Sequence, residues 1–449
     1  MKTNTTIIRN ANQILTLAGE NGKPRTREGM RDLGIIEETD TVIAIHQGKI
    51  VQIGKEAAVL QTIKELGILS ESIHYIDATG KLVMPGLIDP HTHVVFGGSR
   101  EYELELRMNG ATYLEILQQG GGILATTRMT REASEKELFA QTWKRLDVFL
   151  QHGVTTIEAK SGYGLTVEDE LKQLRVAKQL AEAHPLDLIS TFMGAHAIPG
   201  EYKGKPDQYV ELIIEEMLPR IAAEKLAAFC DVFCEHGVFS VEQSERILTA
   251  GKQLGMRPKI HADEIEPMGG AELAARIGAI SADHLLKASD EGIEAMAKAG
   301  VVATLLPGTA FFLMTAPARA RRMIEAGVPV ALSTDRNPGS SPTENLQLIM
   351  NLACLNMKMT PAEVIVATTI NAAHAIGVAR HVGSLEAGKQ ADILIMNVPS
   401  YQHLQYHYGV NHTDTVLKNG QVVVEGGKLV YEHESVSATT GADQSSGRG

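Results

Sequence analysis

The chain has 449 residues, of which 44% are hydrophobic and 21% are charged, and its formal net charge is -12. This length is more than one ordinary domain needs and suits a barrel with a smaller companion domain. The acidic balance argues against nucleic-acid or anionic-membrane binding, because phosphate groups need clustered Lys and Arg. No apolar run approaches the roughly 20 residues that span a bilayer.

The first 85 residues contain short β-prone runs: Thr5–Ile8, Thr41–His46 and Lys49–Ile53. Gly48 predicts a hairpin turn between the last two. Similar runs return near the end of the chain, at Asp392–Asn397, Thr415–Lys418 and Gln421–Val424. Asn419-Gly420 is a strong hairpin signal there. Because neither end has enough strands for a stable sheet, we expect residues 1–85 and 386–433 to form one composite β-sandwich.

Between these ends, short apolar runs alternate with long helical patterns, which is typical of β/α units. The expected strands are Leu87–His93, Val154–Glu158, Leu188–Gly194, Ala228–Glu235, Pro258–Asp263, Ser281–Leu285, Val301–Leu306 and Val328–Asp335. The expected helices include Val167–Ala183, Asp207–Ala223, Val241–Leu254, Asp290–Lys298, Thr343–Asn356 and Pro361–Ile376. Eight strand–helix units close a (β/α)8 barrel of the TIM type, so we predict a catalytic barrel over residues 86–385.

Two further features of the sequence bear on disorder and on cellular location. Residues 434–449 are rich in Ser, Gly and Thr without apolar periodicity, so we expect this tail to be disordered. The chain has only three cysteines and its first residues have no apolar segment of the kind found in secretory signals. We therefore expect a cytoplasmic protein.

Side chains that can bind a metal lie at the C-terminal ends of the predicted strands, where barrel enzymes build their sites. The first strand ends in His91-Thr92-His93, and residues two apart in a strand point to the same side, so both histidines can face the barrel axis. The later strands end in His261, in Asp283-His284 and in Asp335. A single histidine is usually structural, but this set around one mouth predicts one site. Three His and one Asp suit Zn²⁺ or iron, with room for a water.

Longer motifs carry a family resemblance. VMPGLIDPHTH (Val83–His93) resembles the opening of the amidohydrolase superfamily, and GSLEAGKQADILIMN (Gly383–Asn397) resembles that superfamily's return into its β-sandwich. The resemblance covers nearly the whole chain except the tail. A closer resemblance to one branch rests on HTHVVFGGSREYE (His91–Glu103), GGGI (Gly120–Ile123), EAKSGYGL (Glu158–Leu165), MGAHAIP (Met193–Pro199), HADE (His261–Glu264) and STDRNPGSS (Ser333–Ser341), in that order.

This resemblance implies a hydrolase that opens the ring of 4-imidazolone-5-propanoate to N-formimidoyl-L-glutamate in histidine degradation, by a metal-activated water. It implies that the metal ligands are His91, His93, His261 and Asp335. Members with two metals bridge them with a carboxylated Lys on the fourth barrel strand. Here Ala227–Glu235 contains no Lys, so we predict one Zn²⁺ or Fe²⁺/Fe³⁺ per chain. Lys160, after the second strand, is better explained as a structural or substrate-side cation. A homodimer is also implied.

The same motifs suggest catalytic and substrate-binding roles. Glu264 can move a proton from water to the leaving ring nitrogen and thereby contacts the substrate. His284 can hydrogen-bond the water or the developing oxyanion, although a further ligand or an orienting residue are alternatives. The substrate is a small anion, and the guanidinium of Arg100 matches its carboxylate. The resemblance places Arg100 in the substrate pocket with Tyr163, His196, Asn337, Gly339 and Ser340.

Two other functions fit the same residues less well. A cytosine- or guanine-type deaminase would use HADE, His284 and Asp335 equally, but Arg100, Tyr163 and the DRNPGSS segment favour a ring amide that bears a carboxylate. An inactive binding or scaffold protein on the same fold is disfavoured by the complete ligand set and by Glu264.

Two motifs outside this set have simpler explanations. Gly120-Gly121-Gly122 lacks the Lys-Ser/Thr of a phosphate loop and the strand–turn–helix context of a dinucleotide motif, so we expect a mobile loop or lid there. Cys230 and Cys234 have no further soft ligands nearby in the sequence, so apolar packing is expected for both.

Overall fold

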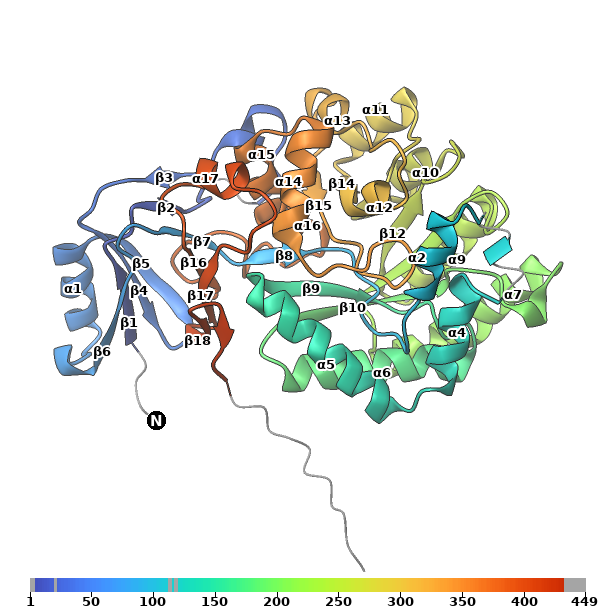
Figure 1. Cartoon of the computed structure of the whole chain (residues 1–449), viewed down its shortest axis with the longest axis horizontal. Helices are drawn as coiled ribbons and strands as arrows, with labels where there is room; N and C mark the ends of the chain where they lie inside the picture. The colour runs from blue at the N-terminus through green and yellow to red at the C-terminus, as the bar shows by residue number, and fades with distance from the viewer. Residues whose placement is uncertain (1–4, 20–21, 112–114, 117–119, 432–449) are drawn as a thin grey trace, which may run out of the picture.

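The computed structural model describes residues 5–19, 22–111, 115–116 and 120–431. Its largest sheet has eight parallel strands in the order β15-β14-β13-β12-β11-β10-β9-β8 and forms a near-closed barrel (Figure 1). The strands are β8 (Leu87–Asp89), β9 (Val154–Lys160), β10 (Asp187–Ala195), β11 (Phe229–Cys234), β12 (Arg257–Ala262), β13 (Ser281–His284), β14 (Val302–Leu305) and β15 (Val330–Leu332). Each of the eight predicted segments overlaps one of them, so the predicted barrel is confirmed. The predicted disordered tail lies outside the described residues.

The barrel is joined between β8 and β15 largely through one buried carboxylate. Asp89 accepts hydrogen bonds from the hydroxyl of Ser333, from the hydroxyl of Thr334 at 2.6 Å and from the amide of Thr334 at 3.2 Å. Burial raises the pKa of Asp89 to about 6 even though these donors favour its charged form. Just beyond, the amide of His93 donates to the carbonyl of Arg336 at 2.9 Å. The two strand ends that precede His91 and Asp335 are therefore held together.

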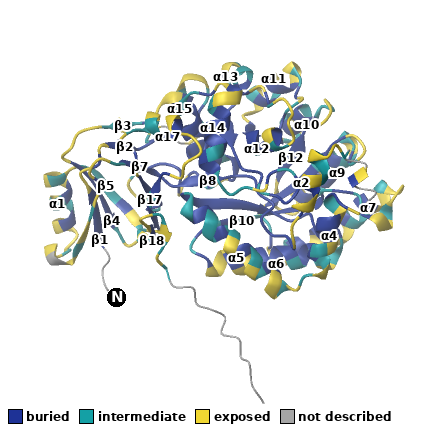
Figure 2. Ribbon diagram, viewed as in Figure 1, coloured by how far each residue is buried: buried dark blue, intermediate teal, exposed yellow. Residues whose placement is uncertain are grey.

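Helices surround the barrel and turn their exposed residues outward, whereas the strands are buried (Figure 2). They are α2 (Tyr102–Met108), α4 (Ile123–Glu132), α5 (Glu135–Gln151), α6 (Val167–Ala183), α7 (Pro206–Leu212), α8 (Leu218–Glu224), α9 (Val241–Gln253), α10 (Gly270–Ile277), α11 (Asp290–Ala299), α12 (Pro307–Phe312), α13 (Ala320–Ala326), α14 (Leu346–Met357), α15 (Pro361–Ala367) and α16 (Ile370–Ala375). Ser134, Ser240 and Thr360 begin three of them with reciprocal capping boxes. Within the described part of the chain, no helix combines the length and apolar character of a membrane span.

Three of the differences between predicted and observed extents have a local physical cause. β8 ends at Asp89, because Pro90 has no N–H for the strand ladder. The helix expected over residues 361–376 is divided at Thr368 and Thr369, whose hydroxyls bond back to carbonyls of the preceding turn. The helix expected over 207–223 contains a π-turn (Ile213–Met217) between α7 and α8.

Both chain ends meet in a seven-stranded sheet with the order β19-β18-β17-β16-β7-β2-β3. Its strands are β2 (Gln13–Leu15), β3 (Ile35–Ile36), β7 (Leu82–Pro85), β16 (Ile393–Met396), β17 (Thr413–Lys418), β18 (Gln421–Glu425) and β19 (Lys428–Leu429). A four-stranded sheet, β5-β4-β1-β6, packs with it and consists of β1 (Thr5–Arg9), β4 (Thr41–His46), β5 (Lys49–Lys55) and β6 (Ile73–Asp77). The predicted sandwich of both ends is confirmed, whereas its limits at residues 85 and 386 stay a prediction.

The remaining helices flank these sheets: α1 (Glu56–Glu65) follows β5, and α17 (Tyr401–Tyr406) follows β16. The two predicted hairpin turns have the backbone that their sequences favour. At Asn419-Gly420 the φ angles are 49° and 72°, and at Gln47-Gly48 they are 50° and 77°. Positive φ at both central residues matches the right-handed twist of the flanking strands, which is why Gly follows in each turn.

Candidate metal centre and active site

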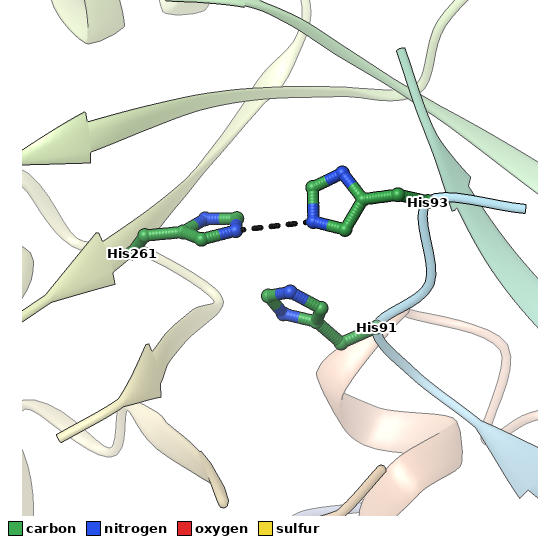
Figure 3. Close-up of side chains that lie close together, drawn as sticks. All are labelled: His91, His93 and His261. Carbon is green, nitrogen blue, oxygen red and sulfur yellow. Dashed lines mark hydrogen bonds between the residues drawn. The ribbon is translucent and has the colours of Figure 1, made fainter. Parts of the chain in front are cut away.

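Four side chains from three separate barrel strands meet at one end of the barrel. His91 and His93 lie just after β8, His261 lies in β12 and Asp335 lies just after β15. The Nε2 atoms of His93 and His261 are 3.4 Å apart, and His91 points to the same space (Figure 3). The Oδ1 atom of Asp335 is 3.4 Å from Nε2 of His91 and 3.8 Å from Nε2 of His93. The predicted ligand set is thus brought together in space.

The spacing and the protonation of these groups suit a metal ion. In a tetrahedral zinc centre with ligand distances of about 2.1 Å, neighbouring ligand atoms are about 3.4 Å apart. The pKa values of His91, His93 and His261 are well below the usual range, first because of burial and then because of the neighbouring histidines and Lys160. Neutral imidazoles are the form that ligates metals. Nε2 of His91 is buried without a hydrogen-bond partner, as expected of a ligand atom.

Two buried carboxylates orient two of these histidines. Oδ2 of Asp283 is 2.7 Å from Nδ1 of His91, and Oδ1 of Asp231 is 3.1 Å from Nδ1 of His261. Each carboxylate accepts a hydrogen bond from Nδ1–H, so that tautomer is favoured and Nε2 keeps its lone pair for a metal. The chemistry of the whole donor set therefore fits a cation held by nitrogen and oxygen ligands, and the His-rich site and its fold suggest a metal.

Glu264 and His284 stand beside this centre. Oε2 of Glu264 is 3.5 Å from Nε2 of His284. Burial, with the charges of Asp335 and Glu235, raises the pKa of Glu264 to about 8. Burial lowers the pKa of His284 to about 3, so this imidazole is neutral. A carboxyl with a pKa near neutrality can both take up and release a proton, which is what a proton-transfer group requires.

A cavity of about 290 Å³ opens above the metal-binding side chains. His93, His261 and Asp335 line its floor, and His91 is buried beneath them. All of the predicted substrate-contacting residues line the same cavity: Arg100, Tyr163, His196, Glu264, Asn337, Gly339 and Ser340. The ring of His196 is stacked on that of His93, with centroids 4.7 Å apart and 14° between the planes. This cavity is thus lined by every residue that the sequence predicted for binding and catalysis except His91.

Arg100 is held rigidly at one side of the cavity by Glu103. Its Nε and Nη2 atoms donate to the two carboxylate oxygens of Glu103 at 2.8 and 2.7 Å. Glu103 also accepts from the amide of Gly122 at 2.7 Å. This carboxylate therefore ties the first βα loop to the glycine-rich segment, where Gly120 and Gly122 adopt φ of 82° and 75°. Nη1, the remaining nitrogen of Arg100, is the atom that a Cβ on Gly339 would meet first.

The loop after β15 is shaped by the side chain of Asn337. Its Oδ1 accepts from the amides of Gly339 and Ser340, both at 2.8 Å, and its Nδ2 donates to the carbonyl of Asp335 at 2.7 Å. Asn337 thus organises the turn that brings Gly339 close to Arg100. Asp335 itself has φ of 53° and His284 has φ of 74°. Left-handed backbone is costly for such residues and concentrates at functional sites.

Sequence reasoning assigned no orienting role to the buried carboxylates around the ligands, although Asp283 was among the candidate metal-binding side chains. Asp89 closes the barrel, Asp231 and Asp283 orient histidines, and Glu103 holds Arg100. Charged residues inside apolar strands, such as Asp231 in FCDVFC, are the signal that could have found them. Lys160 is fully buried and is not among the residues that line the cavity, which favours a structural over a substrate-side cation. Cys230 and Cys234 are buried and free, as expected for packing residues.

The chain belongs to the amidohydrolase family, whose sequence profile matches residues 82–423. Its fold is also similar to that of a zinc-containing adenosine deaminase from Xanthomonas campestris. That similarity has a TM-score of 0.68 at 17% identity and covers 95% of this chain and 94% of the other. At this identity the likeness concerns the fold alone.

The curated relatives are more specific. The chain is 61% identical to the imidazolonepropionase of Brevibacillus brevis over 94% of its own length and 98% of the relative's. It is 59% identical to the imidazolonepropionase of Shouchella clausii over 95% of each chain.

Proposed function

We propose that this chain is a metal-dependent hydrolase that opens 4-imidazolone-5-propanoate to N-formimidoyl-L-glutamate, a step of histidine degradation. The observation that carries the proposal is that one cavity contains both the His and Asp cluster and the Arg100 guanidinium. The cluster suits hydrolysis of an amide bond, and the guanidinium suits the carboxylate of this substrate. The relatives named imidazolonepropionase, at 59–61% identity over nearly the whole chain, support the same substrate.

His91, His93, His261 and Asp335 would hold one cation, either Zn²⁺ or iron, since both accept three imidazoles and a carboxylate. When bound, such a cation lowers the pKa of water and polarises a carbonyl. Water adds to the ring carbonyl carbon, the ring C–N bond breaks, and the carbonyl carbon becomes the α-carboxylate of the product. Glu264 takes the proton from the attacking water and delivers it to the leaving ring nitrogen.

The other residues bind and orient the substrate in this proposal. Arg100, fixed by Glu103, pairs with the propionate through the N–H donors that Glu103 does not use, chiefly those of Nη1. Tyr163 and His196 line the same cavity and offer hydrogen bonds to the ring, and the turn of Asn337, Gly339 and Ser340 offers further donors. His284 hydrogen-bonds the oxygen on which negative charge develops. The small substrate enters from solvent; we further propose a cytoplasmic homodimer that uses no nucleic acid or membrane partner.

A single preparation tests this function. Purified chain is assayed with imidazolonepropanoate, cytosine and guanine, and metal is quantified in the same sample. We expect ring opening of the first compound alone, with about one zinc or iron per chain. Turnover of cytosine or guanine instead would favour a deaminase, and less than about half a metal per chain after careful purification would favour an inactive relative.

A further inference from the structure

A cluster of charged side chains lies below the metal-binding residues, inside the barrel and outside the cavity lining. It comprises Glu158 and Lys160 of β9, Asp231 of β11, Lys259 of β12 and Asp283 of β13, and all five side chains are completely buried. Completely buried charges are rare unless they are paired, because removal from water costs several kcal/mol per ion. Such a cluster must therefore be satisfied internally.

Lys160 is the centre of this cluster. Its Nζ atom is 2.7 Å from Asp231 Oδ2, 2.8 Å from Glu158 Oε1 and 3.4 Å from Asp283 Oδ2. An ammonium has three hydrogens to donate, and these three oxygens match that number. Burial alone disfavours the charged amine, but the three carboxylates raise the pKa of Lys160 above its usual value.

Two of the three carboxylates also contact metal-binding histidines. Asp231 accepts the hydrogen bond from Lys160 on Oδ2, and its Oδ1 lies 3.1 Å from Nδ1 of His261. Asp283 uses the same oxygen, Oδ2, for Nδ1 of His91 at 2.7 Å. One ammonium thus connects through two carboxylates to two imidazoles, one just after β8 and the other in β12.

We propose that Lys160 is a positioning residue: its ammonium holds the carboxylates of Asp231 and Asp283 in the orientations in which they contact Nδ1 of His261 and Nδ1 of His91. Without the ammonium, both carboxylates lose the donor that fixes them, and each can rotate away from its histidine. A rotated carboxylate no longer contacts Nδ1, so the imidazole can turn and its Nε2 is less well placed as a ligand. The inference rests on the metal site of the proposed function.

Lys259 provides a matched control because it is an equally buried lysine in the same cluster. Its Nζ atom donates to the carbonyls of Pro90 and Ala375, at 3.3 and 3.4 Å. It lies 3.7 Å from Glu158 and 3.8 Å from Asp283, beyond hydrogen-bond range of either carboxylate. Removing it deletes a buried charge of the same sign while leaving the contacts of Asp231 and Asp283 with the histidines.

The test compares Lys160→Met with Lys259→Met. Metal-free protein competes with a chromogenic chelator for Zn²⁺, and the Co²⁺-loaded protein gives a visible spectrum that reports ligand geometry. We expect Lys160→Met to bind Zn²⁺ about 10–100-fold more weakly, the usual range when a group supporting the ligands is lost, and to change the Co²⁺ bands. Lys259→Met should stay within about threefold of the unmodified chain. Equal affinities of Lys160→Met and the unmodified chain, or equal losses in the two variants, overturn the inference.

A second pair of variants keeps the inference testable if Lys160→Met does not fold. Glu158→Gln/Lys160→Met removes one charge of each sign, and Glu158 contacts Lys160 but none of the metal-binding histidines. Glu158→Gln alone should keep the Zn²⁺ affinity within about threefold, and the double variant should lose at least tenfold; equal affinity in both overturns the inference. If the unmodified chain itself fails to bind Zn²⁺ or Co²⁺ through these histidines, the proposed function fails instead.

Discussion

A methyl group at position 339 tests how Arg100 is presented to the substrate. A Cβ on Gly339 would lie 2.3 Å from Nη1 of Arg100 and 2.9 Å from its Cζ, whereas ordinary contacts begin near 3.4 Å. Gly339 does not adopt a positive φ, so alanine introduces no backbone strain there. The guanidinium must therefore retreat by about 1 Å to restore normal contact distances.

Such a retreat conflicts with the anchoring of Arg100. Its two hydrogen bonds to Glu103 are 2.8 and 2.7 Å long, and a shift of that size breaks or weakens at least one of them. A hydrogen bond to a charged group contributes about 1.5–3 kcal/mol. If the misplaced guanidinium loses one such bond to the substrate carboxylate, Gly339→Ala should lower kcat/KM about 10–100-fold, mainly through KM.

Steady-state kinetics on two substrates separate this effect from general damage. Gly339→Ala should be impaired on imidazolonepropanoate but stay within about threefold of the unmodified chain on an analogue with an ethyl group in place of the propionate. Gly200→Ala is the control, because a Cβ there meets no atom within 4 Å. An unchanged KM for imidazolonepropanoate, or equal losses on both compounds, would refute the assigned contact between Arg100 and the carboxylate.

Three further substitutions test individual roles. Glu264→Gln should keep its metal but lose about 10²–10⁴-fold in kcat, since it removes the proton-transfer group, and near-normal turnover with stoichiometric metal would exclude that role. Arg100→Ala should mainly raise KM, and an unchanged KM would place the propionate elsewhere. His91→Ala should release the metal on dialysis, as measured by mass spectrometry of the metal, and retained stoichiometric metal would contradict its assignment as a ligand.

The barrel could be predicted from the sequence because its strands are short apolar runs separated by helical periodicity. α6 begins and ends at the predicted residues, since Thr166 caps it and the apolar spacing ends with it. The break at Thr368 and Thr369 could not be predicted, because both residues are tolerated inside a helix and only the packing around them decides. The local sequence pattern therefore predicts that a helix or strand exists more reliably than it predicts the residues at which that element begins and ends.

The candidate site was predictable only in part. His91, His93, His261 and Asp335 stand at strand ends, so the topology of a barrel alone brings them to one mouth. The pairing of Asp283 with His91 joins residues that are 192 positions apart, and no local pattern encodes it. Likewise, Arg100 is a plausible carboxylate ligand in the sequence, but its locking by Glu103 and its contact with Gly339 depend on how three loops pack.

The pairing of β7 with β16 has a consequence for synthesis of the chain. Pro85 pairs with Ile393 and Leu82 with Met396, so the ribosome releases β7 on the order of tens of seconds before its partner exists. During that interval β7 offers an apolar open edge to other nascent chains. Messages truncated before β16 should therefore yield aggregates rather than a smaller enzyme, and translation must pass Met396 before the strand that leads to β8 and His91 is paired on this edge.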